Sequence, residues 1–108
     1  MLYLYDSYGE WIAIKKDQYL FNRNGKWIGW FPNSHGIDEN IAVDLNRKYL
    51  ATIYEEDRLL VNRYQFSLFP PMPVSRPFSL RYIPKPHEHK SRVMILGTED
   101  VNKSDLEL

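Results

Sequence analysis

A short turn motif recurs four times in the first two thirds of this chain, and it limits the folds that the chain can adopt. The clearest copy reads Asn22-Arg23-Asn24-Gly25-Lys26-Trp27-Ile28-Gly29-Trp30. The aligned copies begin at Leu4, Leu20, Ala42 and Leu60, so they are 16, 22 and 18 residues apart. Such uneven spacing is natural for hairpins joined by loops of different length and too irregular for a solenoid. The repeat therefore predicts four equivalent β-hairpins.

Each copy contains the residues of a tight turn between two strands. A side-chain oxygen that can accept from nearby backbone amides opens the turn, at Asp6, Asn22, Asp44 and Asn62. Three residues later the first two copies have Gly9 and Gly25, where a type I turn followed by a bulge needs positive φ. The later copies have Arg47 and Gln65 at this place, so we expect looser turns there.

Apolar residues with a period of two predict strands throughout the first 69 residues. The expected strands are 2–5, 10–14, 19–22, 26–31, 40–44, 48–54, 58–62 and 65–69. After each of the first three turns, an aromatic residue shares its face with a very small one two residues on, as Trp27 does with Gly29. Small side chains permit close approach, so we expect the hairpins to converge on a common axis.

The chain changes character at Pro70, because six of its seven prolines lie within residues 70–86. A segment so rich in proline cannot be central in a sheet. Its apolar residues predict an extended arm, residues 70–96, that packs on the hairpins. These apolar residues are Phe69, Met72, Val74, Phe78, Leu80, Tyr82 and Ile83. We expect a ninth strand or a buried extension at 93–97, one domain over 1–96, and an acidic tail over 97–108 that is frayed or forms one helical turn capped by Ser104.

Composition limits the class of protein and the class of partner. With 14 Lys and Arg against 14 Asp and Glu, the net charge of zero removes the general electrostatic argument for nucleic acid or an anionic membrane as the main partner. The chain has no cysteine, which excludes disulfides and thiolate chemistry and is compatible with the reducing cytoplasm, where we expect the protein. No signal peptide is recognisable, and no apolar run approaches the roughly 20 residues of a membrane span.

The repeat Asp/Asn-x-x-Gly-x-Trp-Ile-Gly/Ala, followed by a proline-studded segment, resembles the bacterial four-fold beta flower family. The resemblance covers residues 2–69 by motif and 70–96 by composition. It implies an all-β fold of four repeated β-hairpins around a pseudo-four-fold axis, with the proline-rich C-terminal arm packed on them. It implies no activity, cofactor or catalytic residue for this chain.

One segment has residues that could ligate a metal. In His87-Glu88-His89, a strand would place both imidazoles on one face as a two-histidine clamp. Two ligands do not complete a site, and the remaining histidine, His35, lies in a distant loop. A solvated turn after Pro86 is the alternative interpretation, in which the chain holds no cofactor.

The links between hairpins differ most from one copy to the next, so we expect partner contacts there. The first link is basic, the third is acidic, and the long second link holds a histidine beside Gly36. The predicted partner-binding residues are Lys15, Lys16, His35, Glu55, Glu56 and Asp57. The aromatic and basic residues around Trp27 are also of the kind that stacks single-stranded bases, but the zero net charge argues against that function.

No motif of nucleophilic catalysis is present, since the sequence lacks a G-x-S-x-G elbow and the spacing of a P-loop. The sequence therefore favours a non-enzymatic protein-interaction module, of the kind found among small accessory or immunity proteins, that binds a protein partner or further copies of itself. The alternative is a metal-dependent hydrolase or small-ligand binder that uses His87 and His89 with Glu88.

Overall fold

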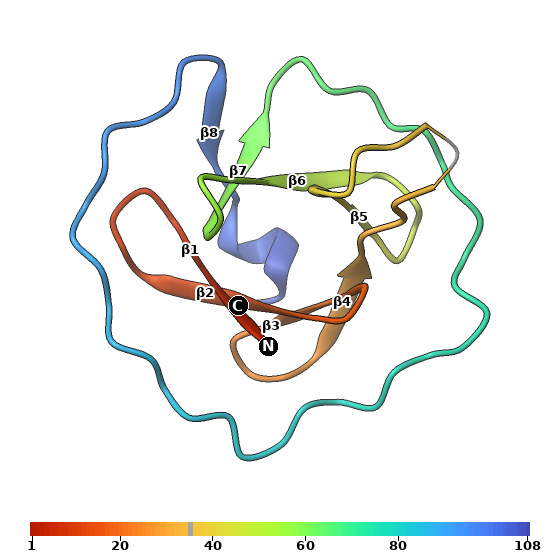
Figure 1. Cartoon of the computed structure of the whole chain (residues 1–108), viewed down its shortest axis with the longest axis horizontal. Helices are drawn as coiled ribbons and strands as arrows, with labels where there is room; N and C mark the ends of the chain where they lie inside the picture. Colours follow the sequence, from red (N-terminus) through yellow and green to blue (C-terminus); the bar gives the residue numbers. More distant parts are fainter. Residues whose placement is uncertain (35) are drawn as a thin grey trace.

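The turn motif and its flanking residues form a sheet in which the strands follow one another in chain order. The computed structural model describes residues 1–34 and 36–108. Its strands are β1 (Leu2–Tyr5), β2 (Trp11–Lys16), β3 (Tyr19–Asn22), β4 (Trp27–Trp30), β5 (Ile41–Asp44), β6 (Tyr49–Tyr54), β7 (Arg58–Asn62) and β8 (Thr98–Asp100). Sequential neighbours are antiparallel, and a parallel pair between Tyr5 and Arg58 closes the sheet into a ring (Figure 1). The predicted all-β fold of repeated hairpins is confirmed.

The residue that opens each turn makes the same local bonds in the first three hairpins. Oδ1 of Asp6 accepts from the backbone amides two and four residues on. Asn22 and Asp44 repeat both bonds. The expected looser third turn is not found, because Arg47 adopts φ 67° and keeps the backbone that Gly25 has at φ 85°.

The fourth hairpin is completed by a distant segment. Asn62 still opens a turn, since its Oδ1 accepts from the amide of Tyr64. The strand predicted at 65–69 does not form, however, and β8 pairs with β7 instead. The physical reason lies in Pro70 and Pro71, which follow at once and have no amide hydrogen for a ladder. The expected ninth strand at 93–97 is likewise displaced, and β8 begins at Thr98.

Two apolar clusters fill the molecule, one inside the ring and one outside it. Along β1 and β3, Leu4 and Leu20 belong to the inner cluster, whereas their strand neighbours Tyr5 and Phe21 belong to the outer one. At Gly29 a Cβ would collide with the carbonyl oxygen of a β5 residue, so the expected close approach of strands occurs there. In the first two hairpins the small residue also lies beneath the preceding ring, because each indole Nε1 donates to its carbonyl.

The C-terminal residues lie at the centre of the ring, where Figure 1 shows the short 3₁₀ helix η1 (Lys103–Leu106). The cap of this turn is Asn102 rather than the predicted Ser104, since the Asn102 side chain accepts from the Ser104 amide. Leu106 is fully buried, and its carbonyl accepts from Nδ2 of Asn22 at 2.9 Å. Residues 97–108, which the sequence set apart as an acidic tail, thus supply one strand and part of the core.

Residues 63–97 run around the outside of the ring, as the green-to-blue trace in Figure 1 shows, and we call this segment the belt. The belt contains the predicted arm and binds the hairpin tips through its backbone. The amide of Leu80 donates to the carbonyl of Gly25, and that of His89 to the carbonyl of Gly9, both at 2.9 Å. The two ends of the belt meet where β7 pairs with β8, so the belt is a loop of chain that surrounds the hairpins.

The belt covers the hairpins mainly with prolines and aliphatic residues. Between Pro70 and Ile95 its covered residues recur every three or four positions, with one step of six after Pro86; they are Pro70, Pro73, Pro77, Leu80, Ile83, Pro86, Arg92 and Ile95. Three residues per turn is the period of polyproline II, which proline favours. Leu80 and Ile83 pack on the outer cluster as predicted. The prediction was wrong for the other apolar residues, which are exposed because they fall between the covered positions: Phe69, Met72, Val74, Phe78 and Tyr82.

Candidate protein-binding surface

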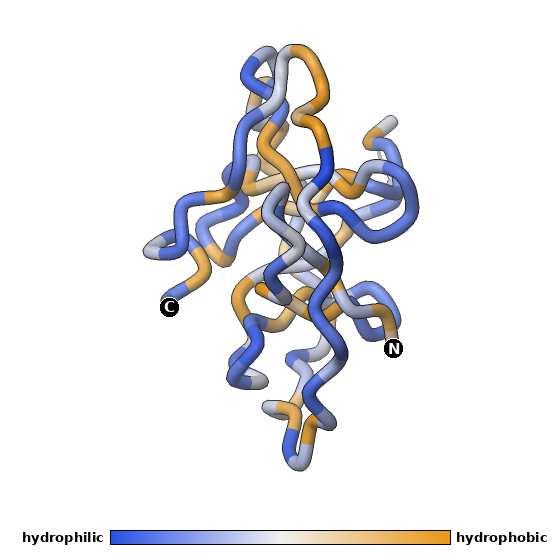
Figure 2. The backbone as a smooth tube through the Cα atoms, turned by 90° about the vertical axis from the view of Figure 1, so that its left-hand side faces the viewer, coloured by the Kyte–Doolittle hydropathy of each residue, from blue (hydrophilic) through white to orange (hydrophobic). Residues whose placement is uncertain are grey.

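The outward side of the belt carries large apolar side chains that nothing covers in the described structure. Seven of them have relative exposures between 77% and 107%: Tyr64, Phe66, Val74, Phe78, Tyr82, Val93 and Leu96. In Figure 2 the belt crosses the front as a mostly hydrophilic segment that becomes hydrophobic at its upper end, next to β8. Large exposed apolar patches on monomers mark interaction sites more often than chance. The exposed residues therefore make the belt the candidate surface.

Two belt aromatics have a backbone conformation that bulky residues seldom adopt. The φ angle is 55° at Tyr82 and 47° at Phe69. A non-glycine residue in this region costs about 1–3 kcal/mol. Packing within the chain does not offset this cost at Tyr82, because its side chain is 96% exposed. The stability of the fold therefore does not explain a tyrosine at this position.

Charge is divided between the belt and the rest of the chain. The belt has six Lys and Arg against the single acidic residue Glu88, a net charge of +5. The remaining 8 basic and 13 acidic residues give −5, so the two parts cancel to the overall zero. The overall net charge of zero conceals this separation, which is visible in the sequence when charges are counted by segment.

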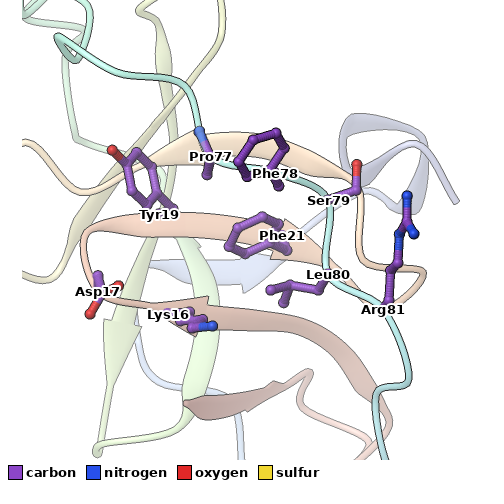
Figure 3. Close-up of a pocket in the computed structure, with 9 residues that line it drawn as sticks. All are labelled: Lys16, Asp17, Tyr19, Phe21, Pro77, Phe78, Ser79, Leu80 and Arg81. Carbon is purple, nitrogen blue, oxygen red and sulfur yellow. The ribbon is translucent and has the colours of Figure 1, made fainter.

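A groove of about 710 Å³ lies between the belt and the β2–β3 hairpin, and we call it the belt groove (Figure 3). Its lining residues are Lys16, Asp17, Tyr19, Phe21, Pro77, Phe78, Ser79, Leu80 and Arg81. Figure 3 shows Phe21 and Leu80 between the two cations, Lys16 and Arg81. The hydroxyl of Tyr19 donates to the carbonyl of Ser75 at 3.0 Å. Hydrogen bonding with the Ser75 side chain lowers the pKa of Tyr19.

Two of the three acidic link residues have structural partners. Oε1 of Glu55 accepts from Arg58 at 2.8 Å, and the Arg58 side chain is only 2% exposed. Oδ1 of Asp57 accepts from Arg92 of the belt at 2.9 Å. Glu56 is exposed and, among the residues that the structure describes, has no ion-pair partner. Of the acidic cluster, Glu56 thus remains available for a partner.

The two lysines of the basic link also differ in their surroundings. Nζ of Lys15 lies 4.6 Å from the centroid of the Phe31 ring, a cation–π contact within the chain. Lys16 lines the belt groove. His35, the predicted contact residue of the second link, lies outside the described residues.

The two histidines of the candidate metal segment have different surroundings. The ring of His89 stacks on Tyr5 with centroids 3.9 Å apart, and its Nδ1 lies 3.5 Å from Asp57. The carbonyl of His87 accepts from the Tyr5 hydroxyl at 3.3 Å, while its side chain is exposed. Over residues 1–34 and 36–108, no three His, Asp or Glu side chains are placed to hold a metal ion. In this structure the segment fastens the belt to β1.

Comparisons with known proteins found a similar segment in a fly protein and a matching family model. The "BLOC-2 complex member HPS5 homolog" of Drosophila melanogaster is 38% identical over 63 residues, which are 58% of this chain and 7% of that protein. This relative comes from a fly, so the likeness is not confined to bacteria. No solved structure matches. None of the helical turns in the described residues has the length and apolar character needed to cross a membrane. The family model described as "4-fold beta flower protein" matches residues 1–91, and the chain therefore belongs to the four-fold beta flower family.

Proposed function

We propose that this chain is a non-enzymatic protein-interaction module that binds its partner through the outward side of the belt. The observation that carries this proposal is the arrangement of the belt, in which four of the six prolines are covered by the hairpins while Phe78, Tyr82 and their apolar neighbours face solvent. Burial of such side chains on a partner would be favourable at roughly 25 cal/mol per Å² of apolar area. The name of the fly relative, a complex member, supports a protein as the partner.

The composition of the belt also supports a protein interface. Aromatic residues and arginine are enriched at the centres of such interfaces, and Lys, Glu and Asp are depleted there. The belt has four arginines, two tyrosines, three phenylalanines and a single acidic residue. We include Lys15, Lys16 and Glu56 as charged contacts at the margin. The cytoplasm is the proposed compartment, in keeping with a chain that has no cysteine.

The test combines cross-linking in cells with binding of purified proteins. A photoreactive residue replaces Phe66, Phe78 or Leu96 of the full chain in the organism that produces it, and mass spectrometry identifies the cross-linked protein. We expect one partner from at least two of these positions. The purified partner is then titrated calorimetrically, and we expect Phe78→Ala to weaken binding about tenfold.

The control position is Asp105, which is exposed on η1 and lies outside the belt. Equal cross-linking from Asp105, or unchanged affinity of Phe78→Ala for the purified partner, would contradict the proposal. Cross-links to nothing but a second copy of this chain would also contradict it, in favour of a homo-oligomer.

A further inference from the structure

We propose that the belt groove binds an extended acidic segment of the partner protein, in which carboxylates flank an apolar side chain. This inference rests on the proposed function and names what the belt recognises. The feature that carries it is an apolar floor of Phe21 and Leu80 between the cations Lys16 and Arg81 (Figure 3).

The shape of the groove fits a segment of extended chain. One wall consists of the consecutive belt residues 77–81, and the other is formed by β3 and the turn that precedes it. Tyr19 and Phe21 stand at alternate positions of β3, so both rings reach the same side of that strand. A volume of about 710 Å³ accommodates several side chains and lies within the range of ligand pockets.

The centre of the groove favours an apolar side chain of the ligand. Phe21 is almost fully buried beneath the groove and supports Leu80, which packs against the outer cluster, so the apolar surface that a ligand would meet is mainly that of Leu80. The ring of Phe78 borders the groove and is 93% exposed. An aromatic or aliphatic side chain bound there would remove both itself and part of the Phe78 ring from water.

The two sides of the groove favour carboxylates of the ligand. Both Lys16 and Arg81 are exposed, and among the described residues neither forms an ion pair. A guanidinium such as that of Arg81 binds a carboxylate through two parallel hydrogen bonds. The net charge of +5 on the belt would also speed the approach of an acidic partner.

The same features weigh against single-stranded nucleic acid as the occupant. Such a strand has a phosphate at every nucleotide, and its backbone would pass Asp17 in the groove and the rest of the chain outside the belt, whose net charge is −5. A peptide can place its carboxylates beside Lys16 and Arg81 and an uncharged residue beside Asp17. Spaced negative charge therefore suits this groove better than continuous negative charge.

The probe for the test is a fluorescein-labelled peptide with one phenylalanine between pairs of aspartates, titrated with the full chain by fluorescence anisotropy. We expect saturable binding that weakens with added salt, because surface charges are screened. Lys16→Glu and Arg81→Glu are each expected to weaken binding about tenfold, which is about 1.4 kcal/mol. Arg81→Gln, a milder change, is expected to weaken binding in the same direction.

The matched control is Lys90→Glu, which reverses an exposed belt cation outside the groove and is expected to change affinity less than about twofold. A peptide with serine in place of phenylalanine, or lysine in place of aspartate, is expected not to bind. Equal losses at Lys90 and Arg81, or no binding of the acidic peptide, would overturn the inference. Tighter binding of a labelled oligothymidylate at the same site would overturn it in favour of nucleic acid.

The two proposals fail separately. Peptide binding without any partner in the cross-linking experiment would overturn the proposed function and leave the groove assignment standing. A cross-linked partner whose affinity for the purified chain is unchanged by Arg81→Glu and Lys16→Glu would support the interaction module and overturn the role of the groove.

Discussion

The residue that opens the second turn binds a third neighbour besides the two backbone amides of the turn. Asn22 is almost fully buried, and its amide donates to the carbonyl of Leu106. A carboxylate cannot make that bond, because it has no proton to donate. Asp6 has no such contact among the residues that the structure describes, and burial raises the pKa of its carboxyl. The need for an amide at Asn22 is therefore set by a contact that is distant in the sequence.

Replacement of Asn22 by Asp tests this difference. Asn22→Asp keeps the acceptor of the turn but sets a carboxylate against the Leu106 carbonyl, so we expect a loss of about 1–3 kcal/mol in the free energy of unfolding. The matched control, Asp44→Asn, lies in a more exposed turn and is expected to change stability by less than about 0.5 kcal/mol. Urea denaturation followed by tryptophan fluorescence measures both, and equal small effects would refute the role of Leu106.

A pH dependence is expected from Glu10. Its carboxylate binds Lys103 and Arg23, each at 2.8 Å, and these bonds lower its pKa from the ordinary value of 4.5. Because the pKa is lower in the folded chain, Glu10 stabilises the fold above pH 4.5 and loses this effect as the pH falls through the folded value. We therefore expect the stability difference between the wild type and Glu10→Gln to be largest at neutral pH and to shrink in acid. A difference that stays constant across a pH series of denaturation curves would contradict this.

The hairpin tips and the belt fit each other through their backbones. The sequence assigned Gly9 and Gly25 to positive φ, yet Arg47 adopts the same sign of φ with a side chain. A Cβ at Gly25 would collide with the carbonyl of Leu80, and one at Gly9 with that of His89. Close approach of the belt, in addition to φ, therefore requires glycine at the first two tips.

A pair of alanine variants separates these two requirements. Gly36 has a similar positive φ, but a Cβ there would meet none of the described residues within 4 Å, so we expect Gly36→Ala to cost about 1 kcal/mol. Gly25→Ala must also displace the belt and is expected to cost about 1–3 kcal/mol more. Thermal unfolding of both variants provides the comparison, and equal costs would show that the belt contact contributes nothing.

The hairpins could be predicted from the sequence because their turn bonds span only two and four residues. The partner of β7 could not, since residues 65–69 have strand-like composition and the strand that replaces them begins at Thr98. The candidate site was predicted in part. Lys16 was among the expected contacts, whereas Arg81 was not singled out in the sequence. Phe78 was missed because apolar residues are expected to be buried, and the belt turns this ring outward.

On the scale of the whole molecule, one ring of strands has residues 101–108 at its centre, which we call the plug, and the belt around its outside. Val101 and Leu106 belong to the inner cluster with residues from β1 to β7, although they lie beyond the family match at residues 1–91. Lys103 and Glu107 form ion pairs with the first two hairpins. The ring and its centre are therefore expected to unfold as one unit.

Truncation after Gly97 tests whether the plug belongs to that unit. It removes β8, Val101 and Leu106, so β7 loses an antiparallel partner and the inner cluster loses two buried residues. We expect the truncated chain to lose its cooperative thermal transition, followed by circular dichroism and by tryptophan fluorescence. A truncated chain that melts cooperatively at the full-length temperature would show that the C-terminal residues are dispensable.

The three-residue period of the belt has a consequence for how its length can vary. Because covered positions recur about every third residue, the loss of one residue would rotate all later residues by roughly 120° about the axis of the belt. Prolines would then turn to solvent, and aromatic rings would turn against the hairpins. Deletion of three residues would preserve the inward set and only shorten the path. In evolution, the length of the belt is therefore expected to change in triplets of residues, as the helical phase of an extended chain requires.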